Sequence, residues 1–220
     1  MRLPVRGLGT PPTYESNFKD AIAFARALGL PVTDLPKVAG ELVNSENGQK
    51  VMGHIQEAGI TSFKRSAMQC VKWNHALRPL VEEALGCRVV LTLGRLFYRG
   101  QSVFNPSVDD LAKWYRQGFQ VEDFAGRVGF NLHAWYTLPT MEVLDLTLCS
   151  SIAAVKNSPD LEGMVIGGWP DDMAETHGYV PLVVGDEYIE EVSRKSIVPL
   201  LASGLSQAEL DAWPVAVVLG

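Results

Sequence analysis

The chain has 220 residues, of which 47% are hydrophobic, and a formal net charge of −6 at pH 7. These values suit one globular domain, and the acidic balance argues against nucleic-acid binding because no basic excess is available for phosphates. No apolar run reaches the roughly 18–20 residues that span a bilayer, and the N-terminus lacks the apolar core of a secretory signal. We therefore expect a protein that is made in the cytoplasm and has no membrane partner, with export without a cleaved signal left open.

Helical spacing dominates the first part of the chain. Apolar residues recur every three or four positions over residues 14–28, and Gly29 follows as a stop. Residues 30–60 are expected to be helical in pieces, with a connection or a helix start at 44–48. The N-terminal part thus predicts helices before any strand.

A second helical stretch, ending at Gly86, carries Cys70 near its start. Pro79 lies inside this stretch and must kink the helix or start a second one, because proline removes a donor and clashes with the preceding turn. Residues 87–94 are rich in β-branched side chains and predict a buried strand. A helix should follow from its cap at Ser107, with Asp110 three residues later, to about Gln117.

Two short strands, 131–138 and 142–147, are predicted on either side of a turn at residues 139–141. His133 stands at the start of the first strand and Asp145 in the middle of the second. A hairpin can bring both side chains to one face. A carboxylate that faces an imidazole fixes its tautomer and raises its basicity.

The last part of the chain alternates short helices and strands. A helix is expected at 148–155, strands at 164–166 and 179–184, a helix at 186–192, and a last short helix capped by Ser206. Helices first, then hairpin-joined strands with short helices between them, indicate an α+β fold with an antiparallel or mixed sheet.

The three cysteines form an odd set without metal-binding spacing, which argues against a disulfide framework. Cys70 at the head of a helix is the preferred nucleophile, because a helix N-terminus favours the thiolate. Cys87 begins the buried strand and is expected in the core. Cys149 is the reserve nucleophile and otherwise a core residue, and His75 lies off the helical face of Cys70 and is interpreted as structural.

Two further residues complete the candidate thiol site. The backbone N–H of Cys70, with Gln69 as a second donor, could stabilise an oxyanion. Trp135 is expected to point to the face opposite His133, with a core position as the main interpretation and a wall of the site as the alternative.

No metal or cofactor is expected. Asp171, Asp172, Glu175 and His177 are residue types that bind cations, but their spacing fits no named site and favours a solvated acidic loop. The adjacent glycines at 167 and 168 do not have the spacing of a phosphate-binding loop.

A cysteine in a helix, followed by His133-Ala134-Trp135 on one strand and Asp145-Leu146-Thr147 on the next, resembles the papain-like cysteine peptidase superfamily. The nearest branches are the transglutaminase-like proteins and the bacterial cell-wall peptidases, and the match covers roughly residues 67–147. The resemblance implies that Cys70 is the nucleophile, His133 the general base and acid, and Asp145 the residue that orients the histidine. It also implies a papain-like fold, with the nucleophile helix packed on a small sheet.

We accordingly expect one papain-like domain over 1–220, with an N-terminal helical part (1–61), a catalytic core (62–150) and a C-terminal α/β extension (151–220). By resemblance the activity is hydrolysis or acyl transfer at an amide bond of a protein, an isopeptide or a cell-wall peptide, without a cofactor. By analogy, the chain would suit a bacterial effector toxin with a secretion-machine or immunity partner. The alternative is a non-enzymatic binding protein in which Cys70 only packs the core.

Overall fold

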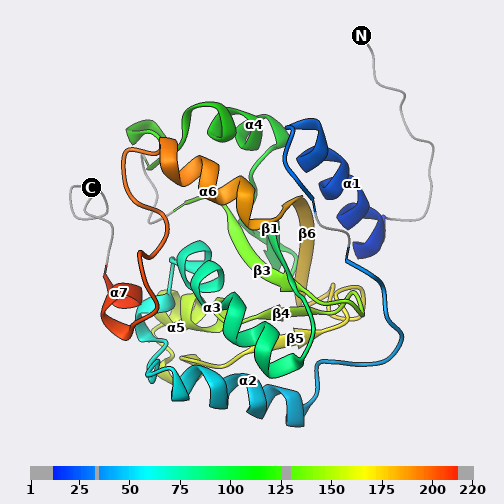
Figure 1. Ribbon diagram of the computed structural model, residues 1–220, viewed down its shortest axis with the longest axis vertical. Helices are drawn as coiled ribbons and strands as arrows, with labels where there is room; N and C mark the ends of the chain where they lie inside the picture. The colour runs from blue at the N-terminus through cyan, green and yellow to red at the C-terminus, as the bar shows by residue number, and fades with distance from the viewer. Residues whose placement is uncertain (1–11, 33–34, 125–129, 213–220) are drawn as a thin grey trace.

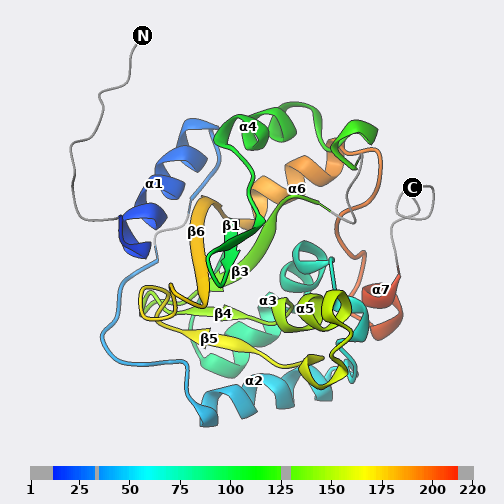
Figure 2. The ribbon, with the colours of Figure 1, turned by 180° about the vertical axis from the view of Figure 1, so that it is seen from behind.

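The computed structural model describes residues 12–32, 35–124 and 130–212, which form an α+β fold (Figures 1 and 2). The helices are α1 (Tyr14–Ala27), α2 (Ser45–Glu57), α3 (Cys70–Leu85), α4 (Val108–Gln117), α5 (Leu148–Lys156), α6 (Asp186–Lys195) and α7 (Gln207–Asp211). The strands are β1 (Val90–Tyr98), β2 (Gln101–Phe104), β3 (His133–Thr137), β4 (Val143–Asp145), β5 (Ile166–Gly168) and β6 (His177–Val184). Short 3-10 turns occur at Lys64–Ser66, Val121–Phe124 and Pro159–Leu161.

The six strands form one sheet in the order β2-β1-β3-β4-β5, with β6 paired to β1. Every pairing among the described strands is antiparallel. The expected α+β class and the helices-first order are therefore confirmed. Helix α3 packs on α2 and against β3, while α1 packs along β6 and α4 lies beside α6 (Figure 1).

Strand β1 is the centre of this sheet because it pairs with three strands, β2, β3 and β6. Strand β6 pairs with it from Thr92 to Tyr98, along one edge. Strands β3 and β2 share the other edge. The pairing with β3 ends where Gly94 pairs with His133, and the pairing with β2 begins where Leu96 pairs with Phe104. The first residue of β3 and the last residue of β2 consequently meet beside β1.

Local signals set several helix boundaries. The Ser107 side chain accepts from Asp110 N–H over 3.0 Å, and the Asp110 carboxylate accepts from Ser107 N–H over 2.8 Å, which completes the predicted capping box of α4. Ser206 caps α7, as expected, and Asn44 caps α2. The expected caps at Ser107 and Ser206 are confirmed, and each side chain accepts from a backbone N–H only three residues later.

Helix α3 is continuous through Pro79 and ends at Gly86, whose φ of 63° lies in the left-handed region. The alternative prediction that Pro79 starts a second helix is therefore wrong, because Pro79 lies inside one continuous helix. One face of α3 buries Trp73, Leu77 and Val81 against the rest of the core. That packing holds the helix together across the missing donor.

The boundaries of β1 and β5 differ from expectation. Strand β1 begins at Val90, because Val89 N–H donates to the Glu82 carboxylate over 3.0 Å instead of pairing with a strand. Cys87 therefore precedes the strand and is half-buried, so its expected core position is wrong. Strand β5 runs over Ile166–Gly168, further into the glycines than expected.

Strand β2 was not expected, although a two-residue turn creates it. Tyr98 pairs with Gln101, and the two residues between them, Arg99 and Gly100, have φ values of 49° and 73°. Positive φ at both positions is the geometry of a type I′ hairpin turn. Arginine rarely occupies the first position of such a turn, so the sequence gives little sign of the hairpin.

Among the described residues, no helix combines the length and the apolar character that a membrane crossing requires.

Candidate functional site: a buried histidine and aspartate beside a cysteine

The predicted hairpin forms and brings His133 and Asp145 together. His133 is the first residue of β3 and Asp145 the last of β4, and Nε2 of the imidazole lies 2.6 Å from Oδ2 of the carboxylate. The register pairs Tyr136 with Leu144, so its continuation places Asp145 opposite Trp135, on the face that carries His133. Both ionisable side chains are 0% exposed.

The Asp145 carboxylate is solvated by the protein instead of by water. Oδ1 accepts from the backbone N–H groups of Thr147 and Leu148 over 3.0 and 3.1 Å, at the start of α5. Oδ2 accepts from His133 and from the hydroxyl of Tyr179, the latter over 3.0 Å. A buried charge is tolerated when its lone pairs are satisfied in this way.

Both members of the pair favour their charged forms. Burial opposes ionisation of His133, but the charges of Asp145 and Cys70 outweigh it and raise the pKa of the imidazole to about 10. Burial also acts to raise the pKa of Asp145, but the charge of His133 and the hydrogen bonds to the carboxylate hold that pKa below its usual range. The imidazole is thus protonated and the carboxylate ionised at neutral pH.

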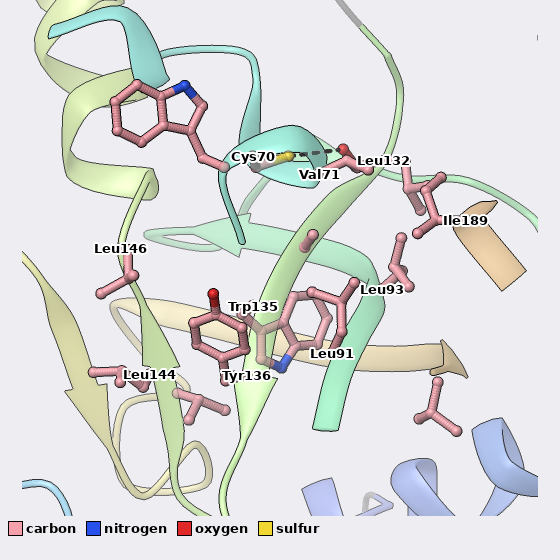
Figure 3. Packing of buried hydrophobic residues seen from close by; sticks show 14 of the residues in the cluster. Cys70, Val71, Leu91, Leu93, Leu132, Trp135, Tyr136, Leu144, Leu146 and Ile189 are labelled. Carbon is pink, nitrogen blue, oxygen red and sulfur yellow. Dashed lines mark hydrogen bonds between the residues drawn. The ribbon is translucent and has the colours of Figure 1, made fainter. Parts of the chain in front are cut away.

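Cys70 is the first residue of α3 and lies beside this pair. Its thiol donates over 3.5 Å to the carbonyl of Leu132, the residue before His133 (Figure 3). Cys70 lies close enough to the imidazole to raise the pKa of His133. Nδ1 of His133 has no partner within strict hydrogen-bond geometry among the described residues, so it is the imidazole nitrogen left for the thiol.

Asn74 joins the cysteine helix to the histidine strand. It lies one helical turn after Cys70, and its Nδ2 donates over 2.9 Å to the carbonyl of Cys70 and over 2.9 Å to the carbonyl of Ala134. Its side chain is fully buried. This cross-link fixes the start of α3 against β3, next to His133.

Gln69 occupies the N-cap of α3 and is 6% exposed. Its Nε2 donates over 2.7 Å to the carbonyl of Arg65, and its Oε1 has no partner among the described residues. One of the two amide hydrogens is therefore engaged by the backbone. The free backbone N–H groups of the first helical turn lie beside it, at Cys70 and the residues that follow.

Trp135 does not point away from His133. The two rings lie 6.0 Å apart and are stacked at 27°, so the expectation of opposite faces is wrong. The reason is the strand period of two, which puts residues 133 and 135 on the same face. The indole is 0% exposed and donates over 2.8 Å to the hydroxyl of Tyr14, so it backs the imidazole from the core side.

The other cysteines and His75 lie in different surroundings. Cys149 is buried in α5, where burial and then the charge of Asp145 raise the pKa of its thiol to about 11. That environment disfavours a thiolate. His75 pairs with Glu190 over 3.2 Å and is thereby tied to α6. All three cysteines are free thiols.

The acidic loop forms no cation site in the part of the chain that the structure describes. No group of three or more His, Cys, Asp or Glu side chains there could hold a metal ion. Instead, Asp171 accepts from Tyr14 N–H over 2.9 Å, and the His177 ring lies 5.3 Å from that of Tyr98.

Sequence reasoning missed Tyr179, Asn74 and Phe104, all of which contact the Cys70–His133–Asp145 group or its backbone. Asn74 carried a signal, because a helical spacing of four residues places it on the face of Cys70. Tyr179 and Phe104 carried none, because strand pairing alone brings them to the site.

No protein-family model matches this chain, and no match was found among curated proteins or among solved structures.

Proposed function

We propose that this protein is a cysteine-dependent hydrolase or acyl transferase that acts on an amide bond. The observation that carries the proposal is the buried His133–Asp145 pair beside a cysteine at a helix N-terminus. A helix that presents the cysteine, packed against adjacent strands that present the histidine and the aspartate, also supports a papain-like arrangement.

In the proposed reaction the Cys70 thiolate attacks the carbonyl carbon of the substrate. Backbone N–H groups at the start of α3, with the remaining amide hydrogen of Gln69, stabilise the oxyanion. The tetrahedral intermediate collapses, the C–N bond breaks, and protonated His133 gives its proton to the leaving amine. A thioester to Cys70 remains.

The second half of the reaction regenerates the thiol. His133, now neutral, takes a proton from water or from an acceptor amine as that nucleophile attacks the thioester carbonyl. The thiolate leaves, and the products are a carboxylic acid or a new amide. Asp145 keeps the imidazole in one tautomer and stabilises its charged form throughout.

Access to the site requires an opening. Cys70 is only 4% exposed and His133 is fully buried, so a substrate carbonyl cannot reach the sulfur while the described residues keep their positions. We propose that part of this cover opens transiently in the free protein, which admits small electrophiles such as iodoacetamide as well as substrate. Proteins, isopeptides and cell-wall peptides are the proposed substrates, and an exported effector with a secretion-machine or immunity partner is the proposed setting.

The test is alkylation of the native protein with iodoacetamide across pH, followed by peptide mass spectrometry. We expect Cys70 to react in the native protein at neutral pH, and Cys149 to react only on unfolding. His133→Ala and Asp145→Ala should slow the reaction of Cys70. The proposal fails if Cys70 in the native wild-type protein is no more reactive than Cys149.

A second candidate is a binding protein in which Cys70 is part of the core. The burial of Cys70 and its contact with the Leu132 carbonyl favour that alternative. In that case Cys70 would resist alkylation until the protein unfolds, and Cys70→Ala would leave its biological activity intact.

A further inference from the structure

Asp145 receives a hydrogen bond that the proposed mechanism does not use. The Tyr179 hydroxyl donates over 3.0 Å to Oδ2, the oxygen that also accepts from His133. Tyr179 belongs to β6, is 4% exposed, and lies 34 residues after Asp145 in the chain. The carboxylate is therefore shared between two side chains from different strands.

The tyrosine is held firmly in its place. Its backbone pairs with Leu96 in the centre of the sheet, and its ring meets that of Trp135 edge-on at 5.1 Å. Burial, and then the charge of Asp145, raise the pKa of the phenol well above its ordinary value. This shift favours the neutral phenol, whose hydroxyl donates to Asp145.

The two oxygens of the Asp145 carboxylate accept hydrogen bonds from different groups. Backbone N–H groups of Thr147 and Leu148 hold Oδ1, so the start of α5 fixes one end of the carboxylate. Besides the imidazole itself, Tyr179 is the donor to Oδ2 within the described part of the chain. Without the Tyr179 hydroxyl, His133 would be the remaining donor to Oδ2 among the described residues. The carboxylate oxygen that orients the imidazole would then be held by the imidazole alone.

We propose that Tyr179 is a positioning residue, which acts on Cys70 through Asp145 and His133. By sharing Oδ2 it sets the direction and the strength of the Asp145–His133 hydrogen bond. This inference rests on the proposed function and deepens it, because it makes the site a group of four side chains from α3, β3, β4 and β6.

The physical consequence of removing the hydroxyl follows from its two effects. Oδ2 loses a donor and becomes a stronger acceptor for His133, which alters the shielding of the proton between them. The carboxylate also gains freedom to rotate, so the imidazole is oriented less well toward the thiol. Both effects act on the hydrogen bond and the orientation of the His133 imidazole, so they can be measured separately from any loss of stability.

The experiment compares Tyr179→Phe with Tyr188→Phe. Tyr188 is a matched control, because it is fully buried and donates one hydrogen bond, over 3.0 Å, to the carbonyl of Leu111 on α4. Each variant loses one buried hydroxyl, and urea unfolding will show that both are folded. Two readouts are measured: the far-downfield proton resonance of His133, assigned by its loss in His133→Gln, and the rate of alkylation of Cys70 by chloroacetamide.

We expect Tyr179→Phe to move the resonance and to slow alkylation by about tenfold, the worth of one hydrogen bond to a charged group. Tyr188→Phe should change neither. The inference is overturned if the two variants give the same resonance and the same rate. If wild-type Cys70 does not react at all, the proposed function fails, while the resonance alone still decides whether Tyr179 controls the Asp145–His133 bond.

Discussion

The ring of Phe104 stacks on the imidazole of His133, with centroids 5.1 Å apart and planes at 14°. These residues end and begin two strands, β2 and β3, that follow each other along one edge of β1. Phe104 thus covers the imidazole on one side, and Trp135 backs it at 6.0 Å. The two aromatic rings account for much of the apolar environment in which the His133–Asp145 pair is charged.

Replacing Phe104 with alanine should uncover His133. We expect a loss of about 3 kcal/mol in the free energy of unfolding, because a buried aromatic ring is removed. We also expect faster modification of His133 by diethylpyrocarbonate at pH 9, where part of the imidazole is neutral and therefore nucleophilic. Val103, which is 46% exposed on the same strand, is the control. Val103→Ala should change stability by less than about 0.5 kcal/mol and leave the modification rate unchanged. Equal modification rates in the two variants would show that Phe104 does not shield the imidazole.

The His133–Asp145 pair should give the protein a window of maximal stability in pH. The pKa of Asp145 is lowered by folding, so its contribution is present above the unfolded value of about 3.9 and is lost as the pH falls through the folded pKa. The pKa of His133 is raised, so its contribution is complete below the unfolded value of about 6.5 and is lost as the pH rises toward 10. The contribution of the pair is therefore largest between about pH 4 and pH 6.5.

The measurement is urea unfolding against pH for Cys70→Ala and for the triple variant Cys70→Ala/His133→Gln/Asp145→Asn. The Cys70→Ala background removes titration of the thiol. We expect the difference in free energy of unfolding to be flat inside the window and to decline on both sides. A difference that did not change from pH 5 to pH 9 would contradict the raised pKa of His133.

Gly94 should not tolerate a side chain. It pairs with His133, and a Cβ built on it would lie 2.1 Å from the carbonyl oxygen of Val180, at the irregularity between β1 and β6. We expect Gly94→Ala to reduce stability by about 1–3 kcal/mol or more, because backbone atoms must shift. The control is Gly53 in α2, where a Cβ meets nothing within 4 Å. Gly53→Ala should stabilise the protein by up to about 1 kcal/mol, so thermal unfolding should move in opposite directions for the two variants.

Glu142 should anchor the segment that leads into α2. Its carboxylate is fully buried and accepts from the N–H groups of Leu42 and Val43, over 2.7 and 3.2 Å, and from the Thr140 hydroxyl over 2.5 Å. Glu142→Gln places an NH₂ group where one of these donors now points, which should cost about 1–3 kcal/mol. Hydrogen exchange should accelerate at Leu42 and Val43 and remain unchanged at the protected amides of α4. Unchanged exchange at all of these amides would refute the anchoring role.

The parts of the fold that were predictable depend on neighbours in the sequence. The capping box at Ser107 and Asp110 and the period of the apolar residues in α1 were sufficient to place those helices. The His133–Asp145 contact was predictable for a related reason. A charged residue in an apolar strand needs a partner, and a hairpin offers one across a short turn.

The parts that were missed depend on pairings between distant segments. Tyr179 reaches Asp145 because β6 pairs with β1, and Phe104 reaches His133 because β2 and β3 share an edge. No local pattern encodes either choice of partner. The error on Trp135 had a different origin, since the strand period of two already places it beside His133.

The position of β6 along β1 has a consequence for the order of assembly. During synthesis the chain emerges from its N-terminus, so Cys70, His133 and Asp145 are all available before β6 exists. The hydrogen bond from Tyr179 and the second edge of β1 can form only when His177–Val184 has been made. A nascent chain therefore carries Cys70, His133 and Asp145 before Tyr179. Under the proposed mechanism, Cys70 would reach its full reactivity only late in synthesis.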